Sequence, residues 1–160
     1  MFRKHYIMCT FSLMIILSGL SIGQSVHQLI PFNGTPQSEI VAQIIADTTA
    51  TGGLLPDRVY ELVGGGLYIC QQTFSVYGDD VLRLRSSNDQ KPVIYLYPTG
   101  TGATPQNPPG NFIRVYGADL ELSGIAVSGF FEPVDSNFNN VQGNMFRNDN
   151  EGSNFTFDNC

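Results

Sequence analysis

Apolar and polar residues alternate in short segments over most of the chain after Pro56. The segments are rich in β-branched and aromatic residues, and clusters of Gly, Asn, Asp and Pro separate them. They are RVYELVGGGLYI, TFSVYG, VLRLRS, PVIYLYP, FIRVYG, LELSGIAVSG and SNFTFDN. This pattern predicts many short strands, which suit a sandwich or a barrel as well as a solenoid.

The stretch over residues 111–130, NFIRVYGADLELSGIAVSGF, favours the solenoid. Its first two strands meet at Gly-Ala-Asp, without the Asn-Gly or Gly-Gly pair that a type I′ hairpin turn uses. The next corner lies between Leu122 and Ile125, where the step between apolar positions changes. Corners without reversal, taken repeatedly, wind a chain into stacked coils. The predicted inward side chains are Leu120, Leu122, Ile125 and Val127, and the predicted outward ones are Asp119, Glu121 and Ser123.

An internal echo supports the same architecture. Residues 112–124 (FIRVYGADLELSG) resemble residues 145–159 (MFRNDNEGSNFTFDN) if the second copy has an insertion between its halves. Self-similarity at a fixed period is typical of solenoids. The alignment places Arg114 opposite Arg147, Leu120 opposite Phe155, and Leu122 opposite Phe157.

One helix is predicted over residues 36–47, within TPQSEIVAQIIADTTATGG. Thr35 suits the N-cap, Pro36 suits the first turn, and Glu39 lies near the positive end of the helix dipole. A Gly-Gly pair ends the pattern. Because a coil leaves its edges open, it must be stacked or capped, and we expect this helix to cap the first coil. The apolar stripe that should face the core consists of Ile40, Val41, Ile44 and Ile45.

The N-terminal segment has the layout of a secretory signal peptide. A short basic start precedes an apolar run, and small residues then precede a cut between Gly23 and Gln24. The run is shorter than the ~20 apolar residues that a membrane span needs, so we expect no span after cleavage. The chain is therefore predicted to be secreted or placed at the cell surface. The predicted organisation is a signal peptide (1–23), a lead-in with the capping helix (24–55) and the first coils of a solenoid (56–160).

Composition and charge exclude several kinds of function. The net charge of −6 argues against a nucleic-acid partner, because phosphate contacts need clustered Lys and Arg. Cys70 and Cys160 are the cysteines outside the leader, and neither forms a CxxC or has a paired His, so no metal site is indicated. Their wide separation in the sequence gives no reason to expect a disulfide.

Three segments carry a resemblance to a known family. PDRVYELVGGGLYI, VLRLRSSNDQKPVIYLYPTG and FIRVYGADLELSGIAVSGF resemble the N-terminal part of right-handed parallel β-helix proteins of the pectate-lyase-like superfamily. The likeness is greatest to large exported bacterial proteins, in which an amphipathic helix and a lead-in similar to ADTTATGGLLPDRVYEL precede the first coils. The resemblance implies an all-β, right-handed parallel β-helix with an N-terminal capping α-helix. It also implies a truncated chain, whose partners include the remaining coils of the same longer protein.

Outward arginines and tyrosines are the candidate carbohydrate-binding residues. Arginine binds carboxylates in a bidentate manner, so aligned arginines would form a basic ladder for a uronate-rich polysaccharide. Tyrosines near strand ends could stack on sugar rings. The competing interpretation pairs each arginine with a nearby acid and packs each tyrosine along the coils. The candidates are Arg83, Arg85, Arg114, Arg147, Tyr95, Tyr97 and Tyr116.

The predicted function is that of an exported non-catalytic module, structural or carbohydrate-binding, within a larger surface or secreted protein. The alternative is the N-terminal segment of a polysaccharide lyase that cleaves uronic-acid polymers by β-elimination. No catalytic constellation is visible in the sequence, and no cofactor is expected. Calcium is expected only for a lyase, and the oxygen-rich segment NDNEGSN (148–154) is interpreted as a turn.

Overall fold

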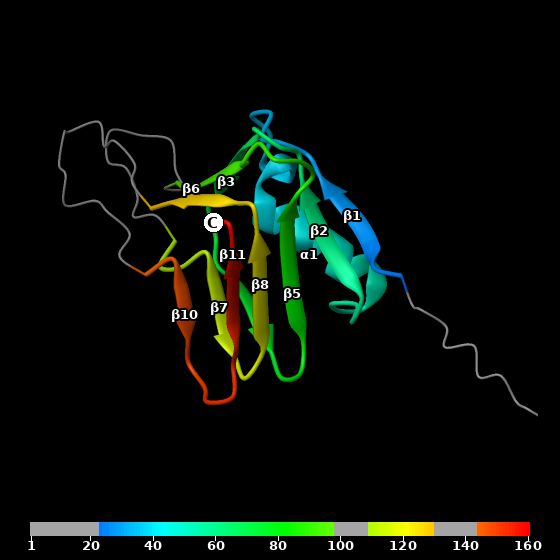
Figure 1. Ribbon diagram of the computed structural model, residues 1–160, viewed down its shortest axis with the longest axis vertical. Helices are drawn as coiled ribbons and strands as arrows, with labels where there is room; N and C mark the ends of the chain where they lie inside the picture. Colours follow the sequence, from blue (N-terminus) through cyan, green and yellow to red (C-terminus); the bar gives the residue numbers. More distant parts are fainter. Residues whose placement is uncertain (1–22, 98–108, 130–143) are drawn as a thin grey trace, which may run out of the picture.

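The computed structural model describes residues 23–97, 109–129 and 144–160 (Figure 1). The predicted signal peptide therefore lies almost wholly outside the described residues. Eleven strands, one 3₁₀ helix and one α-helix form in this part of the chain. Their bounds are β1 Ser25–Leu29, η1 Pro36–Ser38, α1 Ile40–Thr51, β2 Arg58–Leu62, β3 Leu67–Cys70, β4 Phe74–Tyr77, β5 Val81–Ser86, β6 Val93–Leu96, β7 Ile113–Tyr116, β8 Asp119–Ser123, β9 Ala126–Ser128, β10 Phe146–Asn148 and β11 Phe155–Asp158.

The strands form three parallel sheets (Figure 1). Sheet A has the order β1-β2-β5-β8-β11, sheet B the order β3-β6-β9, and sheet C the order β4-β7-β10. Each turn of the chain therefore adds one strand to each sheet, and every strand pair is parallel. This is a parallel β-helix with one N-terminal helix, which confirms the predicted fold class.

The corners form as the sequence predicts. Gly117, between β7 and β8, has φ +77°, and Gly124, between β8 and β9, has φ +67°. This left-handed conformation is accessible to glycine without the steric cost that a Cβ would add. The chain thus changes sheet at each corner without reversing direction.

The internal echo corresponds to real stacking of consecutive coils. The parallel pairing of β10 with β7 places Arg147 opposite Arg114, and that of β11 with β8 places Phe155 opposite Leu120. The extra residues of the second copy lie in the turn between β10 and β11. The predicted alignment is therefore confirmed.

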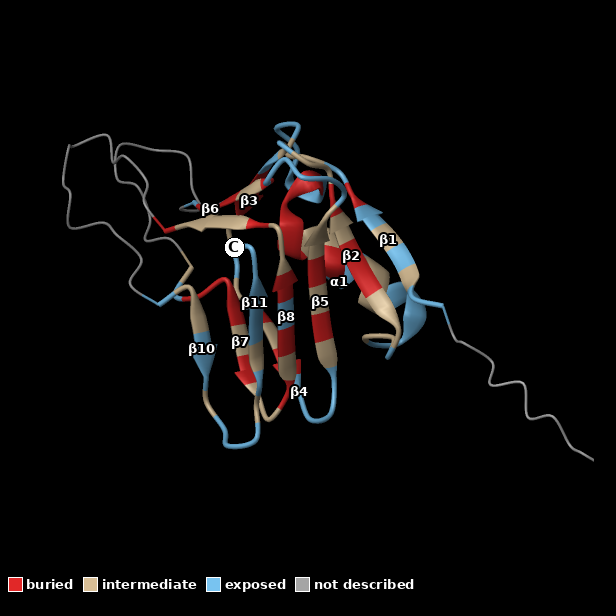
Figure 2. Cartoon of the chain, in the orientation of Figure 1, coloured by how far each residue is buried: buried red, intermediate tan, exposed pale blue. Residues whose placement is uncertain are grey.

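The core lies inside the three sheets and follows the predicted alternation. Leu120, Leu122 and Ile125 are buried, and Val127 packs against them as a partly buried residue. Figure 2 shows the same alternation of buried residues with intermediate or exposed ones along β5 and β8. The outward positions Asp119, Glu121 and Ser123 stay accessible, as predicted.

The helix caps the solenoid, although its start and one of its core residues differ from the prediction. Its buried Ile40, Val41 and Ile44 belong to the same hydrophobic core as the strands. Ile45 was predicted to face the core but is exposed, because only one narrow face of α1 touches the coils. Within the described residues, no helix is long and apolar enough to cross a membrane.

The helix starts later than the pattern indicates because Glu39 leaves the helical conformation. Its backbone is extended (φ −63°, ψ 134°), and its carboxylate accepts a hydrogen bond from the Ala42 amide at 2.6 Å. A 3₁₀ turn occupies residues 36–38, and Gly52, in the left-handed conformation, ends α1. Glu39, not Thr35, is thus the N-cap of α1.

One strand of sheet A was not predicted. Strand β1 pairs in parallel with β2 along its whole length, from Ser25 opposite Arg58 to Leu29 opposite Leu62. The apolar residues of β1 are Val26, which is exposed, and Leu29, which is buried. They lie three positions apart in the sequence, so the apolar residues do not alternate and no strand pattern is visible here.

Candidate functional site

The seven predicted carbohydrate-binding residues do not lie on one face of the solenoid. Sheet A carries Arg83 and Arg85, sheet C carries Arg114, Arg147 and Tyr116, and sheet B carries Tyr95, with Tyr97 directly after β6. The hypothesis of a basic ladder holds in part, because Arg114 and Arg147 are neighbours in register. Arg83 and Arg85 lie on another sheet and share one strand.

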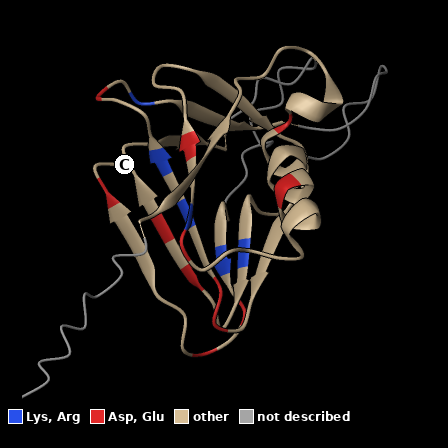
Figure 3. Ribbon diagram, turned by 90° about the vertical axis from the view of Figure 1, so that its right-hand side faces the viewer, with Lys and Arg blue, Asp and Glu red and all other residues tan. Residues whose placement is uncertain are grey.

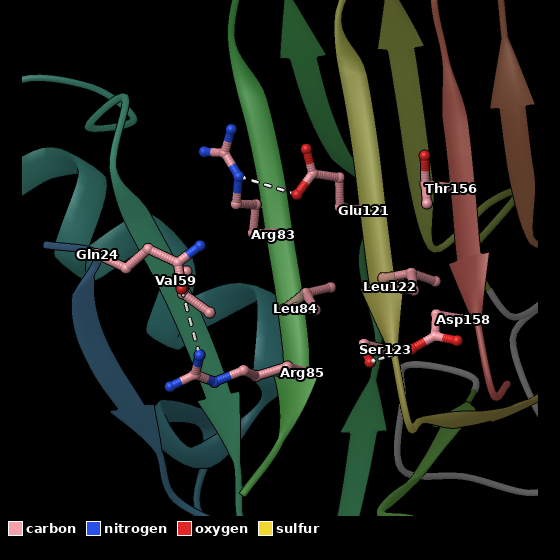
Figure 4. A pocket seen from close by; sticks show the side chains of 10 residues that line it. All are labelled: Gln24, Val59, Arg83, Leu84, Arg85, Glu121, Leu122, Ser123, Thr156 and Asp158. Atoms are coloured by element: carbon pink, nitrogen blue, oxygen red, sulfur yellow. Dashed lines mark hydrogen bonds and ion pairs between the residues drawn. The ribbon is translucent and has the colours of Figure 1, made fainter. Parts of the chain in front are cut away.

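A shallow groove of about 220 Å³ lies on the outer face of sheet A (Figure 4). It extends over β2, β5, β8 and β11, so parallel stacking brings residues from distant parts of the sequence into it. Val59, Leu84 and Leu122 also border it, but their side chains are buried and expose almost no surface there. The polar side chains that line it are Gln24, Arg83, Arg85, Glu121, Ser123, Thr156 and Asp158.

The outward side chains of sheet A form two rows that run from coil to coil. The register places Arg83 beside Glu121 and Glu121 beside Thr156. The second row consists of Glu61, Arg85, Ser123 and Asp158. Each row takes one side chain from each strand, and neighbouring strands in a sheet lie about 4.8 Å apart.

Both arginines of the groove already have acidic partners. Arg83 Nε lies 3.0 Å from Glu121 Oε2, and Arg83 Nη1 donates to the Pro56 carbonyl at 2.7 Å. Arg85 Nη2 lies 2.9 Å from Glu61 Oε2. These pairs support the competing interpretation of the sequence, in which the arginines pair with nearby acids.

Two other polar groups of the groove make contacts of their own. Arg85 Nη1 donates to Gln24 Oε1 at 3.3 Å, and the Ser123 hydroxyl donates to Asp158 Oδ2 at 3.2 Å. Gly23 and Gln24, which flank the predicted signal cleavage, are both exposed. The groove thus presents guanidinium, carboxylate, amide and hydroxyl groups side by side (Figure 4).

Sheet C carries a second cluster on its outer face. The Arg114 guanidinium contacts the Asp149 carboxylate, and Arg147 Nε donates to the same carboxylate at 2.7 Å. The hydrogen bond from Arg114 holds the pKa of Asp149 below its ordinary value and raises the pKa of Arg114. Two arginines and one carboxylate leave this cluster with one excess positive charge.

The tyrosines of sheet C pack against one another and against this cluster. The Tyr77 and Tyr116 rings stack with centroids 4.8 Å apart and planes 7° apart, and Arg114 Cζ lies 5.2 Å from the Tyr116 ring centroid. Tyr116 therefore packs against a neighbouring ring and a guanidinium, which is the packing expected along coils. Tyr77 keeps a large exposed area.

Acidic residues gather at the turns that lead from sheet C to sheet A. Asp79, Asp80 and Asp119 line a small polar hollow, but Asp119 Oδ1 already accepts hydrogen bonds from the backbone and the side chain of Asn154. In the described part of the chain, no three His, Cys, Asp or Glu side chains are grouped as metal ligands. The segment over residues 148–154, apart from Asn148 at the end of β10, forms the turn before β11, in line with the prediction. Figure 3 shows acidic residues on these turns and on the strands, with basic residues among them.

The two cysteines outside the leader are free thiols, in line with the prediction. Cys70 is buried, and its Sγ donates to the Gln72 carbonyl at 3.1 Å. Burial, with a smaller contribution from the nearby Glu39 carboxylate, raises the pKa of this thiol, so it is suited to packing and not to nucleophilic chemistry.

Sequence reasoning missed the side chains that complete the groove on sheet A. Glu61, Thr156 and Asp158 were not assigned to a binding site, Gln24 was considered only for signal cleavage, and Glu121 and Ser123 were considered only as outward positions. The internal repeat of the sequence could have indicated some of these neighbours. The alignment of Leu120 with Phe155 also places Glu121 opposite Thr156 and Ser123 opposite Asp158.

Comparison with known proteins gives no match at any level. No family model, no curated protein and no solved structure matches this chain.

Proposed function

We propose that this chain is a non-catalytic parallel β-helix module of a larger exported protein, and that it binds carbohydrate. The single observation that carries the proposal is the groove of sheet A. It is shallow and lined by donors and acceptors, and hydroxyl groups of a sugar both donate and accept hydrogen bonds. Aliphatic carbons of the lining side chains also suit the C–H faces of sugar rings.

The last described coil supports membership in a longer solenoid. It leaves an apolar hollow of about 330 Å³. The residues that line this hollow include Phe157, whose equivalent position in the preceding coil faces the core. Phe157 is 48% exposed there, although it lies opposite the buried Leu122 in the register. Further coils of the same chain would bury this surface, as the inward residues of β5 and β8 are buried within the solenoid. The right-handed, pectate-lyase-like assignment is part of this proposal.

We propose that the protein is exported, because residues 1–23 have the layout of a signal peptide. Cleavage before Gln24 would place this residue at the mature N-terminus, where a glutamine can cyclise to pyroglutamate. Intact-mass measurement of the protein recovered from the medium or the cell surface of its host tests this. We expect a chain that starts at Gln24, and a protein that retains residues 1–23 in the cytoplasm would overturn it.

The lyase alternative has less support from the geometry. β-Elimination needs a group that removes a proton from the sugar, and a guanidinium stays protonated in proteins. Arg83 and Arg85 are also held by Glu121 and Glu61. We therefore assign both arginines to binding and not to proton transfer.

Affinity electrophoresis tests the proposal. The full chain is run through gels that contain one polysaccharide each, and the same mixtures are assayed for the absorbance of unsaturated sugar ends. We expect retardation in at least one gel and no unsaturated product. Arg85→Ala should reduce the retardation, whereas Lys91→Ala, at an exposed position outside the groove, should not.

The opposite results would be equally informative. Unsaturated product would show a lyase, and the absence of retardation in every gel would leave a purely structural module. Equal losses for the two variants would place the binding site elsewhere.

A further inference from the structure

The charges of the sheet A groove specify the kind of sugar that it accepts, if the module binds carbohydrate as proposed above. Among the groups that line the groove are two arginines, Glu121 and Asp158. Glu61, next to the groove, neutralises Arg85, and Glu121 neutralises Arg83. Asp158 has only a hydroxyl partner, from Ser123, and no basic side chain of the described residues pairs with it.

An acidic sugar would meet this arrangement at a disadvantage. Its carboxylate would have to displace Glu121 or Glu61 from an arginine and would also lie near Asp158. Like charges placed together across an interface are unfavourable, and exclusion of wrong partners by such charges is a common source of specificity. A neutral sugar keeps both ion pairs intact and still finds donors and acceptors.

The direction of the groove indicates a linear ligand. The two rows of side chains cross the strands, so a chain of sugars lying along the solenoid axis meets one side chain from each coil (Figure 4). The first row offers Arg83, Glu121 and Thr156, and the second offers Arg85, Ser123 and Asp158. From β5 to β11 each row spans roughly 10 Å at a strand spacing of about 4.8 Å.

We propose that the groove on sheet A binds a neutral linear oligosaccharide along the solenoid axis and discriminates against uronates. This inference rests on the proposed carbohydrate-binding function and names the ligand class of the same site. It departs from the expectation of a uronate ligand, because the arginines that suggested uronates are already ion-paired.

Calorimetric titration of the full chain tests the inference. The probes are cello-, xylo- and manno-oligosaccharides, compared with oligogalacturonate and oligoalginate of equal length. We expect at least one neutral probe to bind about tenfold or more tightly than either uronate probe, with little dependence on salt. Tighter binding of a uronate, weakened by salt, would overturn the neutral-ligand inference but leave carbohydrate binding standing. Binding of neither class would overturn both.

Two variants place the ligand in the groove. Asp158→Asn removes the carboxylate without a cation, and it should narrow the preference for neutral over acidic probes by several-fold. Asp79→Asn, an exposed carboxylate of another turn, serves as its control and should leave the preference unchanged. An unchanged preference in Asp158→Asn would contradict the role of this charge.

The second variant fills the groove. Thr156→Met should weaken the best neutral probe by about tenfold. Its control is Gln28→Met, which alters an exposed residue of sheet A that does not line the groove. Circular dichroism of both variants checks that the fold is intact, and unchanged affinity in a folded Thr156→Met would place the ligand elsewhere.

Discussion

The two ends of the solenoid bury the same kind of core in different ways. At the capped end, α1 covers the first coils with three fully buried aliphatic residues, Ile40, Val41 and Ile44. At the open end, formed by β9, β10 and β11, the strands alternate in the same way but their apolar residues stay partly exposed. Figure 2 shows β10 and β11 without the buried segments that mark β5 and β8. The alternation of apolar and polar residues therefore predicts which side chains face inward, whereas their burial depends on the elements that cover them.

Polar groups at the capped end are satisfied by tertiary contacts. Glu39 is buried, and its carboxylate accepts hydrogen bonds from the amides of Ala42 and Gln71 and from the Gln72 side chain. Asp47, on the same helix, accepts from the Tyr60 hydroxyl at 2.9 Å. Burial, together with this hydrogen bond, raises the pKa of Tyr60. The cap is thus joined to β2 and to the turn after β3 by specific hydrogen bonds.

At the open end, the core-facing residues of β10 and β11 are aromatic and contact one another. The Phe146 and Phe157 rings lie with centroids 5.2 Å apart, and Phe155 and Phe157 with centroids 6.1 Å apart. Such contacts are less directional than hydrogen bonds and contribute about 0.5–1.5 kcal/mol per pair beyond burial. We expect the capped end to tolerate substitution less well than the open end.

The largest difference should appear within α1 itself. Ile44 is fully buried and Ile45 is exposed, so the same change at neighbouring positions isolates the effect of the core. Ile44→Ala should lower the free energy of unfolding by about 2–5 kcal/mol, and Ile45→Ala by less than about 0.5 kcal/mol. Urea denaturation measures both. Equal losses would show that α1 does not cap the core.

Loss of the buried carboxylate should come next. Glu39→Ala leaves three donors without their acceptor and removes an N-cap, and we expect a loss of about 1–3 kcal/mol in the free energy of unfolding. Glu151→Ala, at an exposed turn position, is the control and should have little effect. A loss as small as that of the control would mean that Glu39 contributes nothing to the cap.

A smaller effect is expected from the aromatic cluster. Phe157→Ala should reduce the free energy of unfolding by about 1 kcal/mol, because the ring is already half-exposed and loses mainly its contacts with other rings. The comparison with Ile44→Ala is made in the same urea titration. A loss equal to that of Ile44→Ala would indicate that the open end is covered in solution.

The smallest effect concerns pH and only the outer face of sheet C. Because the pKa of Asp149 is lowered in the folded chain, its contacts with both arginines stabilise the fold above the ordinary carboxyl pKa of about 4. This contribution is lost as the pH falls below that value, through the folded pKa. In acid, the protection of the β10 amides relative to their intrinsic exchange rates should therefore fall more than that of the β5 amides. In the Asp149→Asn variant, the β10 amides should be less protected already at neutral pH. Unchanged protection of these amides would contradict the stabilising role of the Asp149 carboxylate.

Much of the fold could be predicted because it depends on local pattern. The corner at Gly117, the inward set that begins at Leu120 and the pairing of Arg114 with Arg147 each follow from spacing in the sequence. The start of α1 could not, because Glu39 serves as the N-cap while its carboxylate also accepts from the Gln71 amide, a contact that depends on the fold. Gln71 is 32 residues away from Glu39 in the sequence, and no local pattern around Glu39 predicts this contact.

The candidate site was the part least accessible to prediction. The types of binding residue, arginine and tyrosine on outward strand positions, were identified, but their grouping was not. Whether Arg83 shares a face with Arg114 depends on which sheet each strand joins, and whether Arg83 is free depends on Glu121 in the next coil.

The sequence by itself determined that the chain forms short strands with corners, that Leu120 and Leu122 face inward, and that one helix precedes the coils. Periodicity and turn chemistry act over a few residues, so they can be recognised along the chain. Only the tertiary structure decided that Glu61 neutralises Arg85 and that Ser123 and Asp158 complete one groove. Stacking of parallel coils sets these contacts, because it joins residues through register and not through proximity in the sequence.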